Sequence, residues 1–173
     1  APHGAEAAYY QRSASALVMS QYFMSDMPDL VGRELGVTDW LEVRQDLVNG
    51  FGASTFDLDW MHIDPERAAR ESPFGGPIAF GFWTLSMLTY FSHNVGMWPQ
   101  DAAIGLNYGL DRVRWINPVK IGARIRMRCT LRGFELREDG GYLIRTSNIV
   151  ELEDGCPALT AEWLGVFYPQ VPV

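Results

Sequence analysis

The chain has 173 residues, of which 47% are hydrophobic and 20% charged, with a formal net charge of −7 at pH 7. This length and composition indicate one ordinary globular domain with a sizeable core. The acidic balance argues against nonspecific nucleic-acid binding, which requires a basic surface. It does not exclude an anionic small ligand, because a local arginine cluster can outweigh the net charge.

Neither a leader nor a cofactor motif is visible in the sequence. Residues 1–18 lack the basic start and apolar run of a signal peptide, so we expect a cytoplasmic protein without a membrane partner. Cys129 and Cys156 form no CxxC motif; we expect two buried thiols, with a disulfide as the alternative. Metal-ligand spacings, phosphate loops and dinucleotide fingerprints are absent, so we expect no metal and no cofactor.

The first part of the chain has mainly helical patterns. Residues 1–30 are expected to form a helical extension, with a helix over 5–24 that Pro28 ends; a disordered tail is the alternative. Residues 31–173 are expected to form a single domain. It begins with a strand over 37–43, a short helix over 46–51 and a loop over 53–60.

Two further helices follow. Asp64, Pro65 and Glu66 predict a helix start, with an N-cap aspartate, a proline at the first position and an acid near the positive end of the helix dipole. A Pro/Gly turn at 72–77 leads into a helix over 81–91 that is apolar on every side. Such a helix is expected to be enclosed on every side, and it is too short for a bilayer span of about 20 residues.

After residue 95 the pattern changes to alternation with period two. It predicts strands over 104–116, 124–132, 142–152 and 159–167, with a hairpin turn at 139–141. The arginines of 124–132 share one strand face, which we interpret as a solvated face rather than a phosphate site. Helices followed by consecutive strands indicate an α+β domain with an antiparallel sheet. A single sheet curled around one apolar helix is the hot-dog arrangement.

Acid/base chemistry is concentrated just before the helix start at Asp64. Asp57 and His62 lie five residues apart, and a carboxylate beside an imidazole can activate a water molecule. Local turn capping is the alternative for this pair. Asp59, between them, is either a further site carboxylate or a solvated loop residue. Ser86, midway along the apolar helix, is expected to bond back to a carbonyl, because no GxSxG surrounds it.

Together these stretches resemble the MaoC-like hydratases and dehydratases, a hot-dog family with R-specific enoyl-CoA hydratases and nodulation protein N-like members. The likeness covers residues 31–169. The motifs that carry it are D-x-x-x-x-H at 57–62, DPERA at 64–68, FGGP at 74–77, GFWTLS at 81–86, NYGLDRVR at 107–114, Pro118-Val119 and Gly122.

The resemblance implies a reaction and a substrate. The reaction is reversible addition of water to a trans-2-enoyl-CoA, giving a 3-hydroxyacyl-CoA. The implied partners are an acyl-CoA or acyl-carrier thioester and a second copy of the chain, in a homodimer. Coenzyme A is then part of the substrate. A hot-dog acyl-CoA thioesterase and a non-catalytic acyl-thioester-binding subunit are the alternatives.

The resemblance also implies residue roles. Asp57 and His62 match the water-activating pair, and Gly81 matches the glycine whose backbone N–H binds the thioester oxygen. Ser86 matches a serine that supports the pair, and Asp59 stands where many members carry Asn or another polar residue. The departures are Phe56 and Phe80, which replace a glycine and a histidine of many members.

Overall fold

The computed structural model describes residues 22–95 and 97–170. Most of the helix expected over 5–24 therefore lies outside the described residues. The described part begins with the 3₁₀ turn η2 (Met24–Asp26) and the short helix α2 (Met27–Leu30). Pro28 lies in the first turn of α2, where its missing N–H costs nothing, and does not end a helix. Met24 and Met27 are buried against Leu131, Ile144 and Phe167 of the sheet.

Six strands form one antiparallel sheet in the order β1-β4-β5-β6-β3, and β2 pairs with β4 beside β1. The α+β class and the four long strands expected from the sequence are confirmed. The strand bounds are β1 (Glu34–Val37), β2 (Leu41–Glu42), β3 (Ala102–Trp115), β4 (Arg124–Leu136), β5 (Tyr142–Leu152) and β6 (Pro157–Pro169).

The single strand expected over 37–43 is wrong, because β1 and β2 are separate. Between them, the Thr38 hydroxyl accepts a hydrogen bond from the Met127 backbone N–H at 2.9 Å. The backbone N–H of Thr38 in turn donates to the Met127 carbonyl at 2.9 Å. The Thr38 hydroxyl thus replaces a backbone carbonyl as the acceptor for Met127, and the strand pairing is interrupted there.

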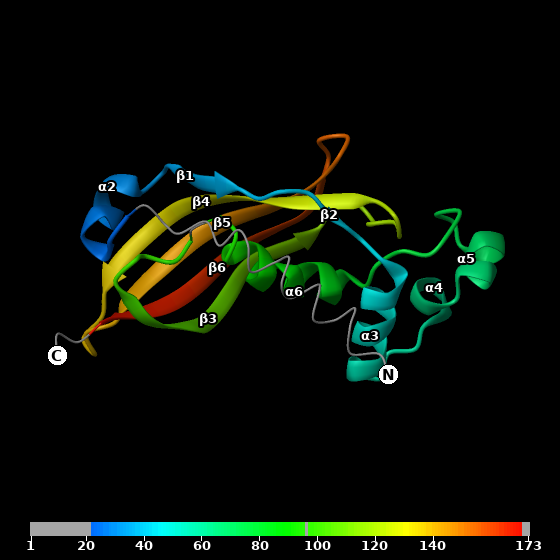
Figure 1. Cartoon of the computed structure of the whole chain (residues 1–173), viewed down its shortest axis with the longest axis horizontal. Coiled ribbons are helices and arrows are strands. Elements are labelled where there is room, and N and C mark those ends of the chain that lie inside the picture. The colour runs from blue at the N-terminus through cyan, green and yellow to red at the C-terminus, as the bar shows by residue number, and fades with distance from the viewer. Residues whose placement is uncertain (1–21, 96, 171–173) are drawn as a thin grey trace, which may run out of the picture.

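The helices before the long strands are α3 (Gln45–Thr55), α4 (Trp60–Ile63), α5 (Pro65–Glu71) and α6 (Gly81–Ser92). The start of α5 and the bounds of α6 agree with the sequence patterns. The helix expected over 46–51 is longer, and it takes the first residues of the expected loop. In Figure 1, α3, α4 and α5 project beyond one end of the sheet, and α6 lies along the sheet.

Helix α6 packs one side against the sheet. Trp83, Leu88 and Phe91 are buried with residues of three strands: Ile125, Met127, Val150, Leu159, Ala161 and Trp163. The expectation that α6 is enclosed on every side is wrong for this single chain. Phe82 is 67% exposed, and Ser86 and Thr89, on the same helix face, are also exposed. This face borders β3, the edge strand of the described sheet, because Phe82 contacts Trp115 and Ser86 and Thr89 share a cavity with residues 107–110.

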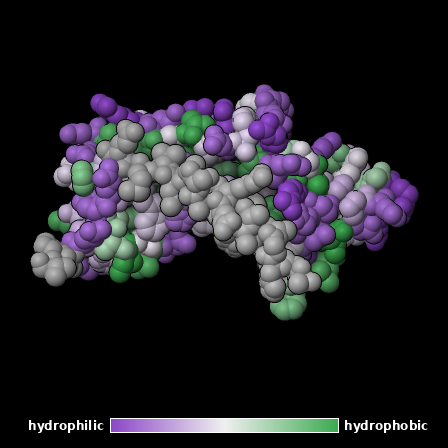
Figure 2. All heavy atoms as spheres, in the orientation of Figure 1, coloured by the Kyte–Doolittle hydropathy of each residue, from purple (hydrophilic) through white to green (hydrophobic). Residues whose placement is uncertain are grey.

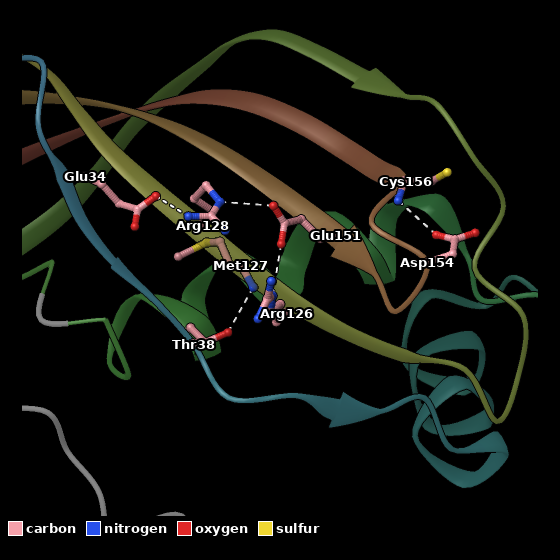
Figure 3. A network of polar contacts seen from close by, with 8 residues as sticks. All are labelled: Glu34, Thr38, Arg126, Met127, Arg128, Glu151, Asp154 and Cys156. Carbon is pink, nitrogen blue, oxygen red and sulfur yellow. Dashed lines mark hydrogen bonds and ion pairs between the residues drawn. The ribbon is translucent and has the colours of Figure 1, made fainter.

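The arginine face of β4 is a network of ion pairs (Figure 3). Arg126 and Arg128 donate to opposite oxygens of Glu151 at 2.9 and 3.0 Å, and Arg128 also pairs with Glu34. Burial alone would raise the pKa of Glu151, but the hydrogen bonds from Arg128 and Arg126 hold it below its usual range. These arginines are therefore already paired with carboxylates, which agrees with the expectation that this face is not a phosphate site.

Both cysteines are free thiols, but only one is buried. Burial raises the pKa of the Cys129 thiol to about 12. The expectation that Cys156 is also buried is wrong. Cys156 is exposed because it follows the tight turn between β5 and β6 and precedes the first residue of β6.

Candidate active site

His62 lies on a single helical turn held between two caps. Asp59 begins α4, where its carboxylate accepts a hydrogen bond from the Met61 N–H at 2.8 Å. Asp64 begins α5 in the same way, accepting from the Arg67 N–H at 2.9 Å. The stretch expected as a loop up to residue 60 is thus followed directly by a helical turn. One oxygen of the Asp59 carboxylate, Oδ1, accepts this capping bond.

A backbone carbonyl orients the imidazole of His62. Its Nδ1 lies 2.7 Å from the carbonyl oxygen of Ile78. A carbonyl oxygen only accepts, so Nδ1 carries a proton, and in the neutral imidazole Nε2 then keeps its lone pair. The ring also packs on Phe80, with ring centroids 3.9 Å apart. Phe80 therefore forms one wall beside the imidazole.

A cavity of about 280 Å³ brings His62 to the amino end of α6. Its lining includes His62, Gly81, Thr84, Trp115 and Asn117. Gly81 is the first residue of α6, where backbone N–H groups have no intrahelical acceptor and the helix dipole favours negative charge. The cavity therefore brings His62 and the first residue of α6 to one space.

Trp115 was not singled out from the sequence as a site residue. Its indole N–H donates to the Gly81 carbonyl at 2.7 Å, although the two residues are 34 positions apart. Ile78, which orients His62, was likewise missed. Spacing along the chain carries no signal for either contact, because both are made across the fold.

Asp57 follows a strained residue. Phe56 is the C-cap of α3 and adopts the left-handed conformation, with φ 59° and ψ 21°. Its side chain is 91% exposed. Asp57 is exposed too, and its carboxylate accepts from the Asp59 N–H at 3.3 Å. Asp57 is not among the residues that line the His62 cavity. Phe56 thus holds a backbone conformation that glycine adopts more readily.

Ser86 lies elsewhere along α6. Its hydroxyl donates to the Phe82 carbonyl at 2.8 Å, the back-bond expected from the sequence. It lines a second cavity, of about 360 Å³, between α6 and β3. The apolar lining of that cavity comes from Leu85, Leu88, Tyr108, Leu110 and Trp163.

The described residues hold no group of three or more His, Cys, Asp or Glu side chains that would bind a metal ion. Within the same ranges, every helix is too short or too polar to cross a membrane.

Residues 26–151 match the family model of the MaoC like domain. The chain belongs to the MaoC-like dehydratase family. Nodulation protein N of Rhizobium meliloti (strain 1021) is 40% identical over 149 residues, which are 86% of this chain and 92% of that protein. The 3-hydroxyacyl-thioester dehydratase Z of Mycobacterium tuberculosis is 38% identical over 140 residues, 80% of this chain and 91% of that protein.

Solved structures of MaoC-like and related proteins share the fold. A monoamine oxidase regulatory protein from Archaeoglobus fulgius superposes with a TM-score of 0.73 at 21% identity, over 90% of this chain and 100% of that one. An (R)-hydratase from A. caviae superposes with a TM-score of 0.64 at 20% identity, over 78% and 94%. The hot-dog fold expected from the sequence is confirmed.

Proposed function

We propose that this MaoC-like protein adds water reversibly to the double bond of a trans-2-enoyl thioester, giving a 3-hydroxyacyl thioester. The observation that supports it best is the shared cavity of His62 and Gly81, with His62 oriented through Ile78. The name of the dehydratase Z relative supports the same substrate class, because that protein is named for 3-hydroxyacyl thioesters.

The roles follow from the geometry of the two groups. The thioester carbonyl accepts a hydrogen bond from the Gly81 N–H, which stabilises the enolate that forms when water attacks Cβ. The free lone pair of His62 Nε2 takes one proton from that water. The oxygen of the water bonds to Cβ, and the proton taken up by His62 is returned to Cα of the enolate. The net change is the addition of one water, without any redox or metal step.

Asp57 is the second member of the proposed pair. It lies in the loop that leads to α4, the helical turn that carries His62, and is exposed in the single chain. We assign it to orienting the attacking water and to sharing the proton transfer with His62. Ser86 and Asp59 take supporting roles only, because the hydroxyl of Ser86 is bonded to Phe82 and the carboxylate of Asp59 caps α4.

The proposed assembly is a homodimer. Strand β3 pairs only with β6 among the described residues, so the outer edge of this 14-residue strand has no partner. Its exposed apolar side chains are Ile104, Leu106, Tyr108 and Leu110. Figure 2 shows hydrophobic atoms on the margin where β3 runs in Figure 1. A long edge strand with exposed apolar side chains favours pairing with a second copy. We expect the dimer to act in the cytoplasm without a cofactor.

The test incubates the purified protein with a panel of short and long enoyl-CoAs. Two signals are followed: loss of the enoyl double bond, by absorbance and mass, and release of free thiol. The proposal predicts a gain of one water with the thioester intact. Thiol release instead would indicate the thioesterase, and tight binding without either signal would indicate a non-catalytic binding subunit.

A further inference from the structure

The connection between β3 and β4 is joined to the segment that orients His62. The Ala79 N–H donates to the Val119 carbonyl at 2.8 Å, and the Ile121 N–H donates to the Pro77 carbonyl at 3.1 Å. Between these bonds, Lys120 lies opposite Ile78 in an isolated antiparallel bridge. Lys120 is therefore paired through its backbone with Ile78, the residue whose carbonyl oxygen binds His62.

Two cavities border on this connection. The His62 cavity and a larger one of about 450 Å³ share Asn117 and Pro118 in their linings. The larger cavity is also lined by Lys120, Arg124, Glu153, Asp154 and Cys156. Figure 3 shows Cys156 at the turn that joins β5 and β6. A ligand whose reactive end lies by His62 thus meets this second cavity beside Asn117 and Pro118.

Lys120 supplies the available positive charge of the second cavity. Arg124, also in its lining, pairs with Glu153 at 3.1 Å. The Asp154 carboxylate accepts from the Cys156 N–H at 2.9 Å. No acidic side chain within residues 22–95 and 97–170 pairs with Lys120, which is exposed. It is also the only lysine of a chain whose other basic residues are arginines.

We propose that the cavity beside Lys120 binds the phosphate that is linked to the pantetheine arm of the substrate. This inference rests on the proposed function, since it assumes a thioester in the His62 cavity. Coenzyme A and the prosthetic group of an acyl carrier protein both carry a phosphate at this end of pantetheine. An ammonium group is a suitable partner for it, because charge-assisted hydrogen bonds to phosphate oxygens are stronger than neutral ones.

The first test compares Lys120→Gln with the wild-type protein on two enoyl thioesters. One is the CoA thioester, and the other is the N-acetylcysteamine thioester, which lacks phosphate. We expect KM for the CoA thioester to rise about tenfold, as for the loss of one hydrogen bond to a charged group, with kcat within about twofold. KM for the N-acetylcysteamine thioester should not change, and Lys120→Arg should restore most of the affinity.

Arg132→Gln is the matched control. It removes the same unit of charge, but from an exposed position within β4, eight residues after Arg124. Its KM values should equal those of the wild type. An equal rise in KM for Lys120→Gln and Arg132→Gln would overturn the proposal, because it would indicate a general effect of net charge. So would an unchanged KM for the CoA thioester in Lys120→Gln.

The phosphate source is distinguished with a third substrate, the enoyl thioester of phosphopantetheine. An equal effect of Lys120→Gln on this substrate and on the CoA thioester assigns Lys120 to the phosphate next to pantetheine. An effect on both substrates that is larger for CoA assigns it an additional contact with the nucleotide phosphates. An effect confined to CoA would overturn the assignment to the pantetheine-linked phosphate.

A second readout does not depend on turnover. Cys156 is exposed in the same cavity, and Cys129 is buried, so iodoacetamide should alkylate Cys156 alone. Acetyl-CoA should slow this alkylation in the wild type and not in Lys120→Gln. If acetyl-CoA slows the alkylation of Cys156 but no enoyl thioester is hydrated, the proposed function is contradicted and the phosphate site is supported. If enoyl thioesters are hydrated but acetyl-CoA does not slow the alkylation, and KM is unchanged in Lys120→Gln, the phosphate site is overturned and the proposed function is supported.

Discussion

The indole N–H of Trp115 donates a 2.7 Å hydrogen bond to the carbonyl oxygen of Gly81. The bond joins the end of β3 to the first turn of α6. It therefore fixes the amino end of the helix at the point where we place the thioester oxygen. The same contact leaves no room for a side chain at residue 81.

Gly81→Ala tests this contact. The new Cβ would lie 2.9 Å from Trp115 Nε1, and the ring cannot retreat without losing its hydrogen bond. We expect a loss of about 1–3 kcal/mol of unfolding free energy, typical of overpacking. We also expect hydration to fall at least tenfold, because the oxyanion donor moves. Gly76→Ala is the control, since a Cβ there meets no atom within 4 Å. Equal stability of the two variants in urea would contradict the clash.

Phe56→Gly should stabilise the protein. Phe56 has a φ of 59°, and its ring is 91% exposed, so little packing offsets the strain. The left-handed conformation costs a non-glycine residue about 1–2 kcal/mol. The greater freedom of glycine in the unfolded chain reduces the stability that is gained by removing this strain. We expect a net gain of about 0.5–1 kcal/mol by urea unfolding. Phe56→Ala keeps the strain and should change little. A loss of stability in Phe56→Gly would mean that the ring packs in the assembled protein.

The free edge of β3 predicts the effect of a charge there. Leu106 is 54% exposed on this strand. Leu106→Lys should shift the protein from dimer to monomer in sedimentation equilibrium, because a lysine on an edge strand opposes pairing. Leu136→Lys is the control, since Leu136 is 68% exposed at the end of β4. A dimer of unchanged affinity in Leu106→Lys would place the interface elsewhere.

The two thiols should react very differently. Cys129 is buried with a pKa near 12, so its thiolate is scarce at ordinary pH. A nearby Asp154 carboxylate also raises the pKa of Cys156, but that thiol is exposed. At pH 8 we expect one fast equivalent with Ellman's reagent in the folded protein and two in guanidinium. Two fast equivalents without denaturant would contradict the burial of Cys129.

Local patterns predicted much of this fold. The apolar stretch gave α6 within one residue, and alternation gave four long strands with errors of a few residues at their ends. The split between β1 and β2 escaped prediction, because it depends on a hydrogen bond that the Thr38 hydroxyl accepts from Met127 of a distant strand. The exposed face of α6 around Phe82 also escaped, because hydropathy reports apolar character and not which neighbour covers it.

The site was predictable in part. The spacing of Asp57 and His62 and the helix start at Gly81 pointed to the residues that we assign to catalysis. Ile78 and Trp115 were not predictable, since their contacts join segments that are distant in sequence. Lys120 belongs to no motif, but it is the only lysine of the chain, and this could have drawn attention to it.

The central claim is that His62 and Asp57 activate the water. The most direct measurement is kcat/KM for hydration of the best enoyl-CoA in His62→Gln and Asp57→Asn, with thermal unfolding followed in parallel. We expect each to fall about 100-fold or more, as for the loss of a general acid or base, with little change in melting temperature. His93→Gln, at the exposed carboxyl end of α6, should keep full activity. Wild-type activity in either His62→Gln or Asp57→Asn would contradict the account.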